Sequence, residues 1–237
     1  GRRPQPRWDR LRIPAHLWRN EALGIDSDVW DMWSKVNEDA LAKDTSQTKV
    51  CLSHPVEFTF GFGGLHGVAV DGKRFKNVKL LDVASMYPTI IIFLQALGLA
   101  TAKYDGIRKH RLEVKHKDKI LSDALKRILN SVYGNLKNQY SILFNPMASA
   151  TVCIYGQIAL FDLCRRLDDA GYQVVNANTD GVAFCGMGTG YEDIWHQWEK
   201  DYDPMRLELD VFDTWIQKDV NNYIATKGEK IKVKGGD

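Results

Sequence analysis

Cysteine is scarce in this chain, and no two cysteines stand at the spacing of a metal-binding pair. The four cysteines are isolated at positions 51, 153, 164 and 185. Without a CxxC pair a zinc site is not expected. Set among apolar neighbours, they are typical of reduced packing residues in an intracellular protein, so we expect a cytoplasmic location.

Long apolar runs are also lacking. No stretch of eighteen apolar residues occurs, so the sequence predicts no membrane span. The opening GRRPQPRWDR has no apolar segment behind its arginines, and therefore does not resemble a signal peptide. The chain starts without Met and stops at KVKGGD, from which we expect a piece of a longer protein.

What is present is ordinary for a globular protein: 237 residues, 44% hydrophobic and 26% charged, enough for one or two domains with a sizeable core. The net charge of +2 is small, but positive residues cluster in two places. Residues 108–119 hold six Lys or Arg against two acids, and lysines recur at 227, 230, 232 and 234. Such clusters either face phosphates or are solvated surfaces.

Apolar periodicity and turn residues predict alternating strands and helices. Strands are expected at 56–70 around a glycine turn, at 76–82, on both sides of a tight turn within 172–184, and in the tail 206–234. Helices are expected near 27–43, at 89–99, at 108–136 as two helices joined near 117–118, at 147–170 as a long amphipathic helix, and at 191–202.

The first chemical motif is DVASMYPT at 82–89. Asp82 ends a predicted strand, and Pro88 then opens a helix, as proline favours the first helical position. The backbone N–H groups of Ser85, Met86 and Tyr87 would lie near that helix N-terminus, which suits an anion. By itself the segment favours a plain strand–turn–helix corner with an ordinary capping acid.

The second motif is KRILNSVYG at 126–134. Lys126, Asn130 and Tyr133 fall at i, i+4 and i+7, on one helical face. A cation, an amide and a phenol in one stripe suit a phosphate with a base or sugar. The alternative is a surface helix whose lysine is solvated.

The third motif is NTD at 178–180, followed by Gly181, between two apolar strands. A hairpin tip can hold a carboxylate rigidly in solvent. Alone, Asn, Asp and Gly are the usual residues of a plain hairpin.

Together and in this order, the three segments resemble motifs A, B and C of family B DNA polymerases. Those motifs read DxxSLYPS, KxxxNSxYG and DTD, and the chain matches the second at every specified position. The resemblance covers residues from about 56 to the end. It implies a template-directed, DNA-directed DNA polymerase with primer-template DNA and deoxynucleoside triphosphates as partners, and the short span between motifs A and B is similar to phage enzymes. A phage gene would place the protein in a host cytoplasm.

The resemblance has departures. Asn178 replaces the first acid of DTD, and Gly61 replaces the tyrosine of a YxGG segment. A Lys-x-Tyr element reads Asn221-Asn222-Tyr223, without the lysine, and a Thr-x-x-Gly-Arg element reads Cys153 to Gln157.

The resemblance implies roles for individual residues. Two Mg²⁺ ions, for which Mn²⁺ can substitute, would be bridged by the catalytic Asp82 and Asp180, with Asn178 as a neutral ligand or a partner of a metal-bound water. The incoming nucleotide would meet Ser85, Met86, Tyr87 as steric gate, Arg111, Lys115, Lys126 and Asn130. DNA would contact Tyr133, Gly134, Lys232 and Lys234.

The fold implied is α/β, an antiparallel palm sheet backed by helices with a short helical-hairpin fingers insertion. The expected parts are a lead-in at 1–55, palm at 56–100, fingers at 101–137, palm at 138–220 and the start of a truncated thumb at 221–237. Two rivals remain: another palm nucleotidyltransferase such as a reverse transcriptase, and an inactive polymerase-like domain that only binds nucleic acid.

Overall fold

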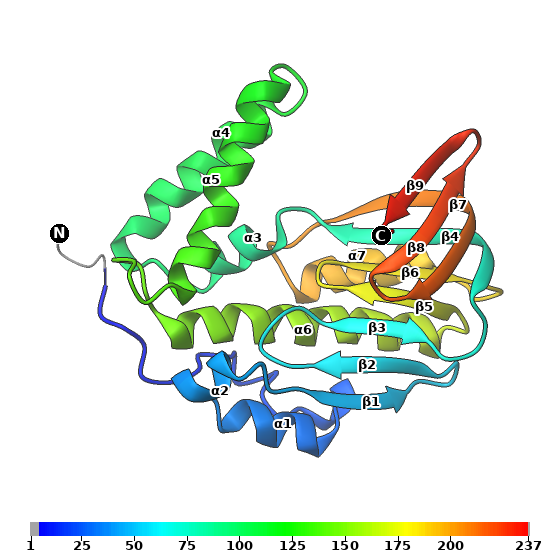
Figure 1. Ribbon diagram of the computed structural model, residues 1–237, viewed down its shortest axis with the longest axis horizontal. Coiled ribbons are helices and arrows are strands. Elements are labelled where there is room, and N and C mark those ends of the chain that lie inside the picture. The colour runs from blue at the N-terminus through cyan, green and yellow to red at the C-terminus, as the bar shows by residue number, and fades with distance from the viewer. Residues whose placement is uncertain (1–4, 237) are drawn as a thin grey trace.

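A single antiparallel sheet organises the chain. The computed structural model describes residues 5–236, so the first four residues of the lead-in and the final residue of the tail lie outside the description. Nine strands run in the order β1-β2-β3-β5-β6-β4-β7-β8-β9, and every neighbouring pair is antiparallel (Figure 1). The strands are β1 (Gln47–Cys51), β2 (Val56–Phe60), β3 (His66–Ala69), β4 (Arg74–Val83), β5 (Gln173–Asn178), β6 (Gly181–Cys185), β7 (Leu207–Asp219), β8 (Asn222–Lys227) and β9 (Lys230–Lys234).

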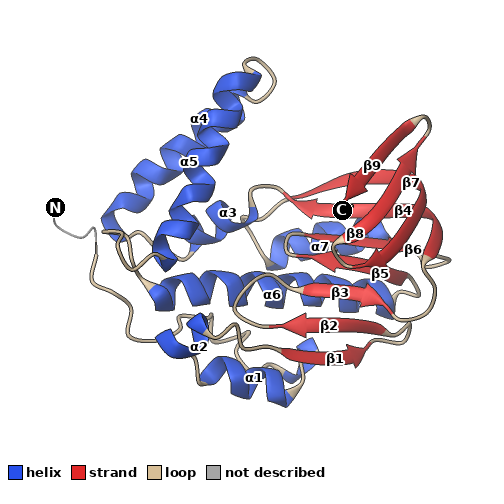
Figure 2. Ribbon diagram, in the orientation of Figure 1, coloured by secondary structure: helices blue, strands red, loops and turns tan. Residues whose placement is uncertain are grey.

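Helices cover one face of this sheet, with α6 (Pro146–Asp169) lying along it (Figure 2). The others are α1 (Ser27–Ser34), α2 (Glu38–Ala42), α3 (Met86–Phe93), α4 (Thr101–Val114), α5 (Lys119–Lys137) and α7 (Tyr191–Asp201), with short 3-10 turns at Glu21–Leu23 and Gly98–Ala100. The expected α/β class, an antiparallel sheet backed by helices with a helical hairpin, is confirmed.

Helix α6 is the centre of the core. The helix predicted at 147–170 is confirmed to within one residue at each end, but its predicted amphipathic character was wrong. Almost all of its side chains are buried, because the sheet covers one side while the segment before β1 and the neighbouring helices cover the other. By length and composition it is the one helix in residues 5–236 that could span a membrane, but 94% of the relevant window is buried inside the protein. It does end at Gly171, as expected, whose φ is 91°.

The segment before β1 packs beneath the sheet through tryptophans. Trp30 lies edge-on to both Trp18 and Trp33, with ring centroids 5.1 and 5.3 Å apart. Trp33 is fully buried, and its Nε1 donates to the carbonyl oxygen of Gly61 at 2.9 Å. Aromatic contacts therefore attach this segment to the loop between β2 and β3.

The hairpin of α4 and α5 projects from the body beside the sheet (Figure 1). Asp118 caps α5 by accepting from the N–H of Leu121 at 3.0 Å, which ends the link between the two helices where the sequence predicted it. The Tyr104 hydroxyl donates to the carbonyl oxygen of Leu129 at 2.7 Å and fixes the two helices against each other.

The helix predicted at 89–99 from Pro88 was misplaced. It begins at Met86, so Pro88 is its third residue, and it ends at Phe93. Gln95 and Gly98 both adopt left-handed backbone, with φ of 55°, and this conformation cannot continue an α-helix.

The thiols of Cys153, Cys164 and Cys185 are buried and free, and Cys51 is half-buried and also free.

Candidate active site

Two aspartates from distant segments meet at the middle of the sheet. Asp82, near the end of β4, pairs in register with Gly181, the first residue of β6. Asp180 precedes that glycine, and its carbonyl oxygen accepts from the N–H of Val83 at 2.7 Å. A Cβ at position 181 would overlap Oδ1 of Asp82, so glycine is needed to leave room for this carboxylate.

Both carboxylates are held in a setting that disfavours their charge. Burial, with the neighbouring Asp180 as the next cause, raises the pKa of Asp82 to about 6, against a partial opposing effect of Lys232. Burial also raises the pKa of Asp180, although its side chain opens onto the cleft; Lys234 and Lys126 oppose this shift. Unpaired carboxylates so placed repel each other, and a cation between them would relieve the repulsion.

This donor set fits a divalent cation that prefers oxygen ligands, such as Mg²⁺ or Mn²⁺. Asp82 and Asp180 are the residues that would hold it. Within residues 5–236 no three His, Cys, Asp or Glu side chains are grouped as a closed metal cage. Two protein ligands suit Mg²⁺, which usually keeps several waters and completes its shell with substrate phosphates.

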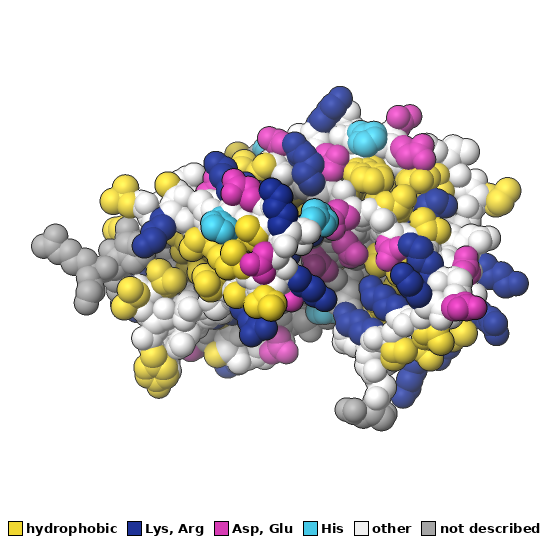
Figure 3. All heavy atoms as spheres, turned by 90° about the horizontal axis from the view of Figure 1, so that it is seen from above, with side chains coloured by type: hydrophobic (Ala, Val, Ile, Leu, Met, Phe, Trp, Pro, Cys, Tyr) yellow, Lys and Arg dark blue, Asp and Glu magenta, His cyan; other side chains and the backbone are white. Residues whose placement is uncertain are grey.

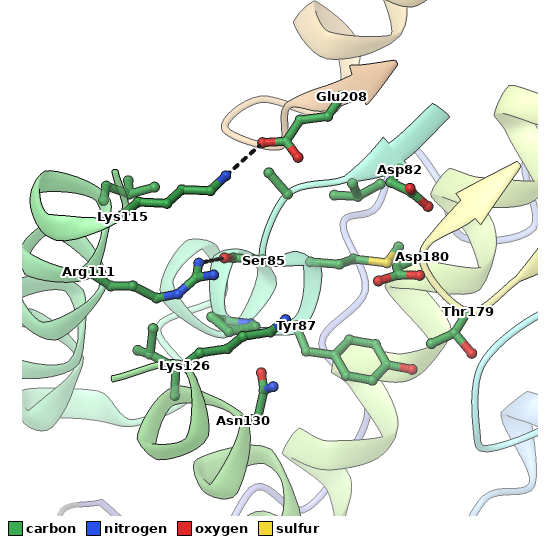
Figure 4. A pocket seen from close by; sticks show the side chains of 16 residues that line it. Asp82, Ser85, Tyr87, Arg111, Lys115, Lys126, Asn130, Thr179, Asp180 and Glu208 are labelled. Atoms are coloured by element: carbon green, nitrogen blue, oxygen red, sulfur yellow. Dashed lines mark hydrogen bonds and ion pairs between the residues drawn. The ribbon is translucent and has the colours of Figure 1, made fainter. Parts of the chain in front are cut away.

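A cleft of about 450 Å³ opens beside the aspartates, with the helical hairpin as its opposite wall (Figure 4). Positive side chains on that wall come from α4 and α5. Its lining includes seven residues predicted from the sequence to bind nucleotide: Ser85, Met86, Tyr87, Arg111, Lys115, Lys126 and Asn130. The predicted residues are thus brought together, while their roles remain predictions.

Two of these cations already have partners. Arg111 Nη1 donates to Oγ of Ser85 at 3.1 Å, and Lys115 Nζ lies 3.2 Å from Oε1 of Glu208 (Figure 4). Arg111 Nε is buried and has no hydrogen-bond partner among the described residues. An unsatisfied guanidinium donor beside an exposed Lys126 makes this wall suitable for an anion with several oxygens.

The ring of Tyr87 lines the cleft and packs against Tyr133 behind it. The rings of Tyr87 and Tyr133 lie 4.4 Å apart at 37°, and the Lys137 ammonium is 4.7 Å from the centroid of Tyr133. Because α3 and α5 each contribute one ring, this stack fixes the hairpin against the start of α3. Gly134 follows on the exposed side of α5, where a Cβ would meet open space, and its predicted DNA contact stays a prediction.

A second hollow of about 300 Å³ shares the aspartates. Its other wall comes from β8 and β9 and includes Lys232 and Lys234. Lys232 also lies 5.7 Å from the ring of Phe212. Figure 3 shows Lys and Arg side chains gathered over this end of the molecule, and the lysines at 227, 230, 232 and 234 are all exposed. The carboxylate pair is therefore flanked by two basic hollows.

The hairpin that carries Asp180 is braced from the β2–β3 side. Thr179 has a φ of 61°, its N–H donates to the carbonyl oxygen of Leu65 at 2.8 Å, and a Cβ on Gly64 would overlap its side chain. Gln157, buried on α6, accepts from the N–H of Gly61 at 3.1 Å and donates to its carbonyl oxygen at 2.9 Å. The glycine segment thus positions the hairpin that carries Asp180.

Sequence reasoning missed Glu208, and it named Gln157 only as a departure from a motif. Glu208 pairs in register with Asp82 on the neighbouring strand and contributes to raising the pKa of that carboxyl. Gln157 takes the place of an arginine in the motif comparison, and here it serves as the anchor of Gly61. Alternating polar residues in β7 gave no signal for Glu208, because the partner strand is fixed only in the folded sheet.

Comparisons with known proteins place the fold. No protein-family model and no curated protein sequence matches the chain. Among solved structures it is similar to the family B DNA polymerase of the hyperthermophilic archaeon Pyrobaculum calidifontis, with a TM-score of 0.55 and 16% sequence identity. The match covers 70% of this chain and 28% of that polymerase. At this identity the likeness shows a shared fold, and the chain spans little more than a quarter of the polymerase.

Proposed function

We propose that the chain is the palm and fingers portion of a family B, template-directed DNA polymerase, which extends a primer 3′-hydroxyl and releases pyrophosphate. The observation that carries the proposal is the cleft itself. It brings a carboxylate pair from one set of strands opposite Arg111, Lys115 and Lys126 from the helical hairpin. Carboxylates that hold cations, facing a cationic wall, are what nucleotidyl transfer requires.

In this proposal Asp82 and Asp180 hold the divalent ions, which when bound activate the primer hydroxyl and neutralise the leaving pyrophosphate. Lys126 and Arg111 orient the triphosphate and offset the charge that moves toward the leaving group. The Arg111 Nε is buried and has no partner, so it would donate to the triphosphate only after the side chain turned toward the cleft. Lys115 serves the triphosphate only after leaving Glu208.

The sugar of the incoming nucleotide would lie over Tyr87, with Asn130 beside it on α5. Tyr87 is half-buried and stacked on Tyr133, so its ring cannot easily move aside. A rigid ring at this place excludes a ribose 2′-hydroxyl by its volume, which favours deoxynucleotides.

The second hollow would take the primer end. Lys232 and Lys234 flank the aspartates there and suit the phosphates of a primer strand. Tyr133 and Gly134 would face the templating base pair on the far side of the Tyr87 ring. With so few basic groups, DNA binding by this chain alone should be weak and salt-sensitive.

One competing function has an observation in its favour. Asn178 replaces an acid of the resembled motif, and Lys115 is engaged by Glu208. An inactive domain that only binds nucleic acid would tolerate both features. It would bind primer-template DNA without incorporating nucleotides.

Primer extension with Mg²⁺ on a fluorescent DNA primer-template separates the two functions. For a polymerase we expect slow incorporation by the wild-type chain, and Asp180→Asn should lower kcat by several orders of magnitude because a charged ligand leaves the reacting centre. DNA binding, measured by anisotropy in the same samples, should change little.

The matched control is Asp71→Asn, which removes one exposed carboxylate in the turn before β4 and should leave extension unchanged. Binding with no incorporation by the wild type would favour the inactive domain. Equal extension by wild type and Asp180→Asn would exclude the two-carboxylate centre. An RNA template, run in parallel, tests the reverse-transcriptase alternative.

A further inference from the structure

Two of the departures from the resembled motifs, Asn178 and Asn221, touch each other in the folded chain. Asn178 Nδ2 lies 3.4 Å from Oδ1 of Asn221 and donates to the carbonyl oxygen of Val220 at 3.3 Å. These residues are 43 positions apart in the sequence and belong to different hairpins. Their contact joins the tip that carries Asp180 to the turn between β7 and β8.

The β7–β8 turn is a firm support for this contact. The Asp219 carboxylate accepts from the N–H of Asn221 at 2.9 Å and from Asn222 Nδ2 at 2.8 Å. These hydrogen bonds lower the pKa of Asp219, so it stays charged at neutral pH. Gly235 packs so closely against the turn that a Cβ there would overlap Oδ1 of Asn222.

A neighbouring amide repeats the pattern. Asn176 Nδ2 donates to the same Val220 carbonyl oxygen at 3.2 Å and lies 3.3 Å from Oε1 of Gln217. The end of β5 is thus attached to the turn by amide donors. A carboxylate at 178 has no proton to give and would face a carbonyl oxygen instead.

The hollow around Asn178 already holds Asp82 and Asp180. A third acid at 178 would add repulsion, which a cation at 221 would offset together with Lys232 and Lys234 of the same hollow. The resembled motifs have that combination: an acid in DTD and a lysine in Lys-x-Tyr. Here both members are neutral amides, so the summed charge of the two positions is unchanged.

We propose that Asn178 and Asn221 form a neutral amide pair that replaces an acid–lysine pair, and that this pair positions the Asp180 hairpin. Asn178 is then a positioning residue, and its amide is engaged by the protein on both sides: Thr179 Oγ1 also lies 3.4 Å from its Oδ1. The missing acid and the missing lysine are one coupled change. The catalytic consequence of this pair rests on the proposed function, while the contact between the two residues does not.

A double-mutant cycle tests the coupling. Asn178→Asp, Asn221→Lys and the double variant are unfolded thermally in EDTA, without DNA or nucleotide. Asn178→Asp should lower the midpoint by about 3–6 °C, because it loses a donor and places a charge against the Val220 carbonyl. The double variant should recover most of that loss, which makes the two changes non-additive.

The matched control for net charge is Glu229→Gln, which adds the same unit of positive charge in the exposed turn at the other end of β8. Combined with Asn178→Asp, it should give no recovery. Additive effects of Asn178→Asp and Asn221→Lys, or equal recovery by Glu229→Gln, would overturn the proposal. If Asn178→Asp does not fold, the cycle is run with Asn178→Ala and Asn221→Ala, where a direct contact again requires non-additive losses.

Primer extension supplies the second readout. Asn178→Asp should lower kcat by about three- to tenfold, equal to about 0.7–1.4 kcal/mol, with the nucleotide KM unchanged because the hairpin wall is intact. Asn221→Lys should restore kcat. A coupled loss of stability in a chain that never extends a primer would support the pair and reject the polymerase. Additive effects on stability in a chain that does extend a primer would reject the pair and support the polymerase.

Discussion

Removing the Asp82 charge should stabilise the chain when no divalent metal is present. The pKa of this carboxyl rises from 3.8 to about 6 through burial and the nearby Asp180. At about 1.4 kcal/mol per pKa unit, that corresponds to roughly 3 kcal/mol. Because Asp82 is only half-buried and borders a solvent-filled cleft, screening reduces this to about 1–2 kcal/mol.

The sign follows from proton linkage. The folded state binds the Asp82 proton more tightly than the unfolded state, so this stability is fully present below about pH 4 and is lost as the pH rises through about 6. Asn at position 82 is uncharged at every pH, so the Asp82→Asn variant keeps this stability when the pH rises. At pH 7.5 in EDTA, Asp82→Asn should therefore unfold at a midpoint about 3–6 °C above wild type.

The assay is thermal unfolding followed by circular dichroism at pH 4 and pH 7.5, with EDTA or with excess Mg²⁺. Mg²⁺ should raise the wild-type midpoint at pH 7.5 and leave Asp82→Asn nearly unchanged, because only the wild type keeps both of the proposed ligands. At pH 4 the two proteins should differ little.

Asp105→Asn is the matched control of opposite sign. Asp105 lies on α4, and although slight burial opposes the shift, its ion pairs with Arg108 at 2.9 Å and with Lys109 lower its pKa. It therefore stabilises above about pH 4, and its replacement should destabilise at pH 7.5. If Asp82→Asn were less stable than wild type at pH 7.5 in EDTA, the reasoning about repelling carboxylates would be refuted.

Three further changes probe the site through different properties. Tyr87→Ala should raise ribonucleotide relative to deoxyribonucleotide incorporation at least tenfold, about 1.4 kcal/mol of selectivity, measured as a kcat/KM ratio; an unchanged ratio would mean that Tyr87 is not the gate. Lys126→Ala should raise nucleotide KM and lower kcat, since its charge faces the triphosphate in the proposed complex, and near wild-type values for both would reject that role. Gly181→Ala should cut primer extension about a hundredfold, because the new Cβ would displace the Asp82 carboxylate. Gly106→Ala, on the open face of α4, is the neutral control. Full activity of Gly181→Ala would show that the carboxylate can move without loss of activity.

Local patterns in the sequence determined most of the elements. The stripe of Lys126, Asn130 and Tyr133 does share one face of α5, because a helix repeats every 3.6 residues. The turn at 178–181 and the link between α4 and α5 also lie where the local residue preferences predict them. These features depend on neighbours in the chain, so the chain alone reveals them. Their roles in catalysis were inferred from the resemblance and stay predictions.

The face that each element buries was decided by tertiary structure. Helix α6 reads as amphipathic from its polar residues, yet Gln157 is buried and satisfied there, because its side chain bonds both the N–H and the carbonyl oxygen of Gly61 from another segment. Helix α3 likewise stops at Phe93 where Gln95 turns left-handed, which no apolar run predicts. Partners distant in sequence set these outcomes.

The active-site geometry divides in the same way. The chain supplies the types of side chain that the candidate site needs: the acids at 82 and 180, the cations of the helical hairpin, and the glycine that follows Asp180. Only the antiparallel pairing of β4 with β6 and β7 put Asp82 between Gly181 and Glu208, and only the packing of two turns put Asn178 against Asn221. Side-chain type is fixed by the chain, whereas the distance between charges, and with it their pKa values, depends on how remote strands pair.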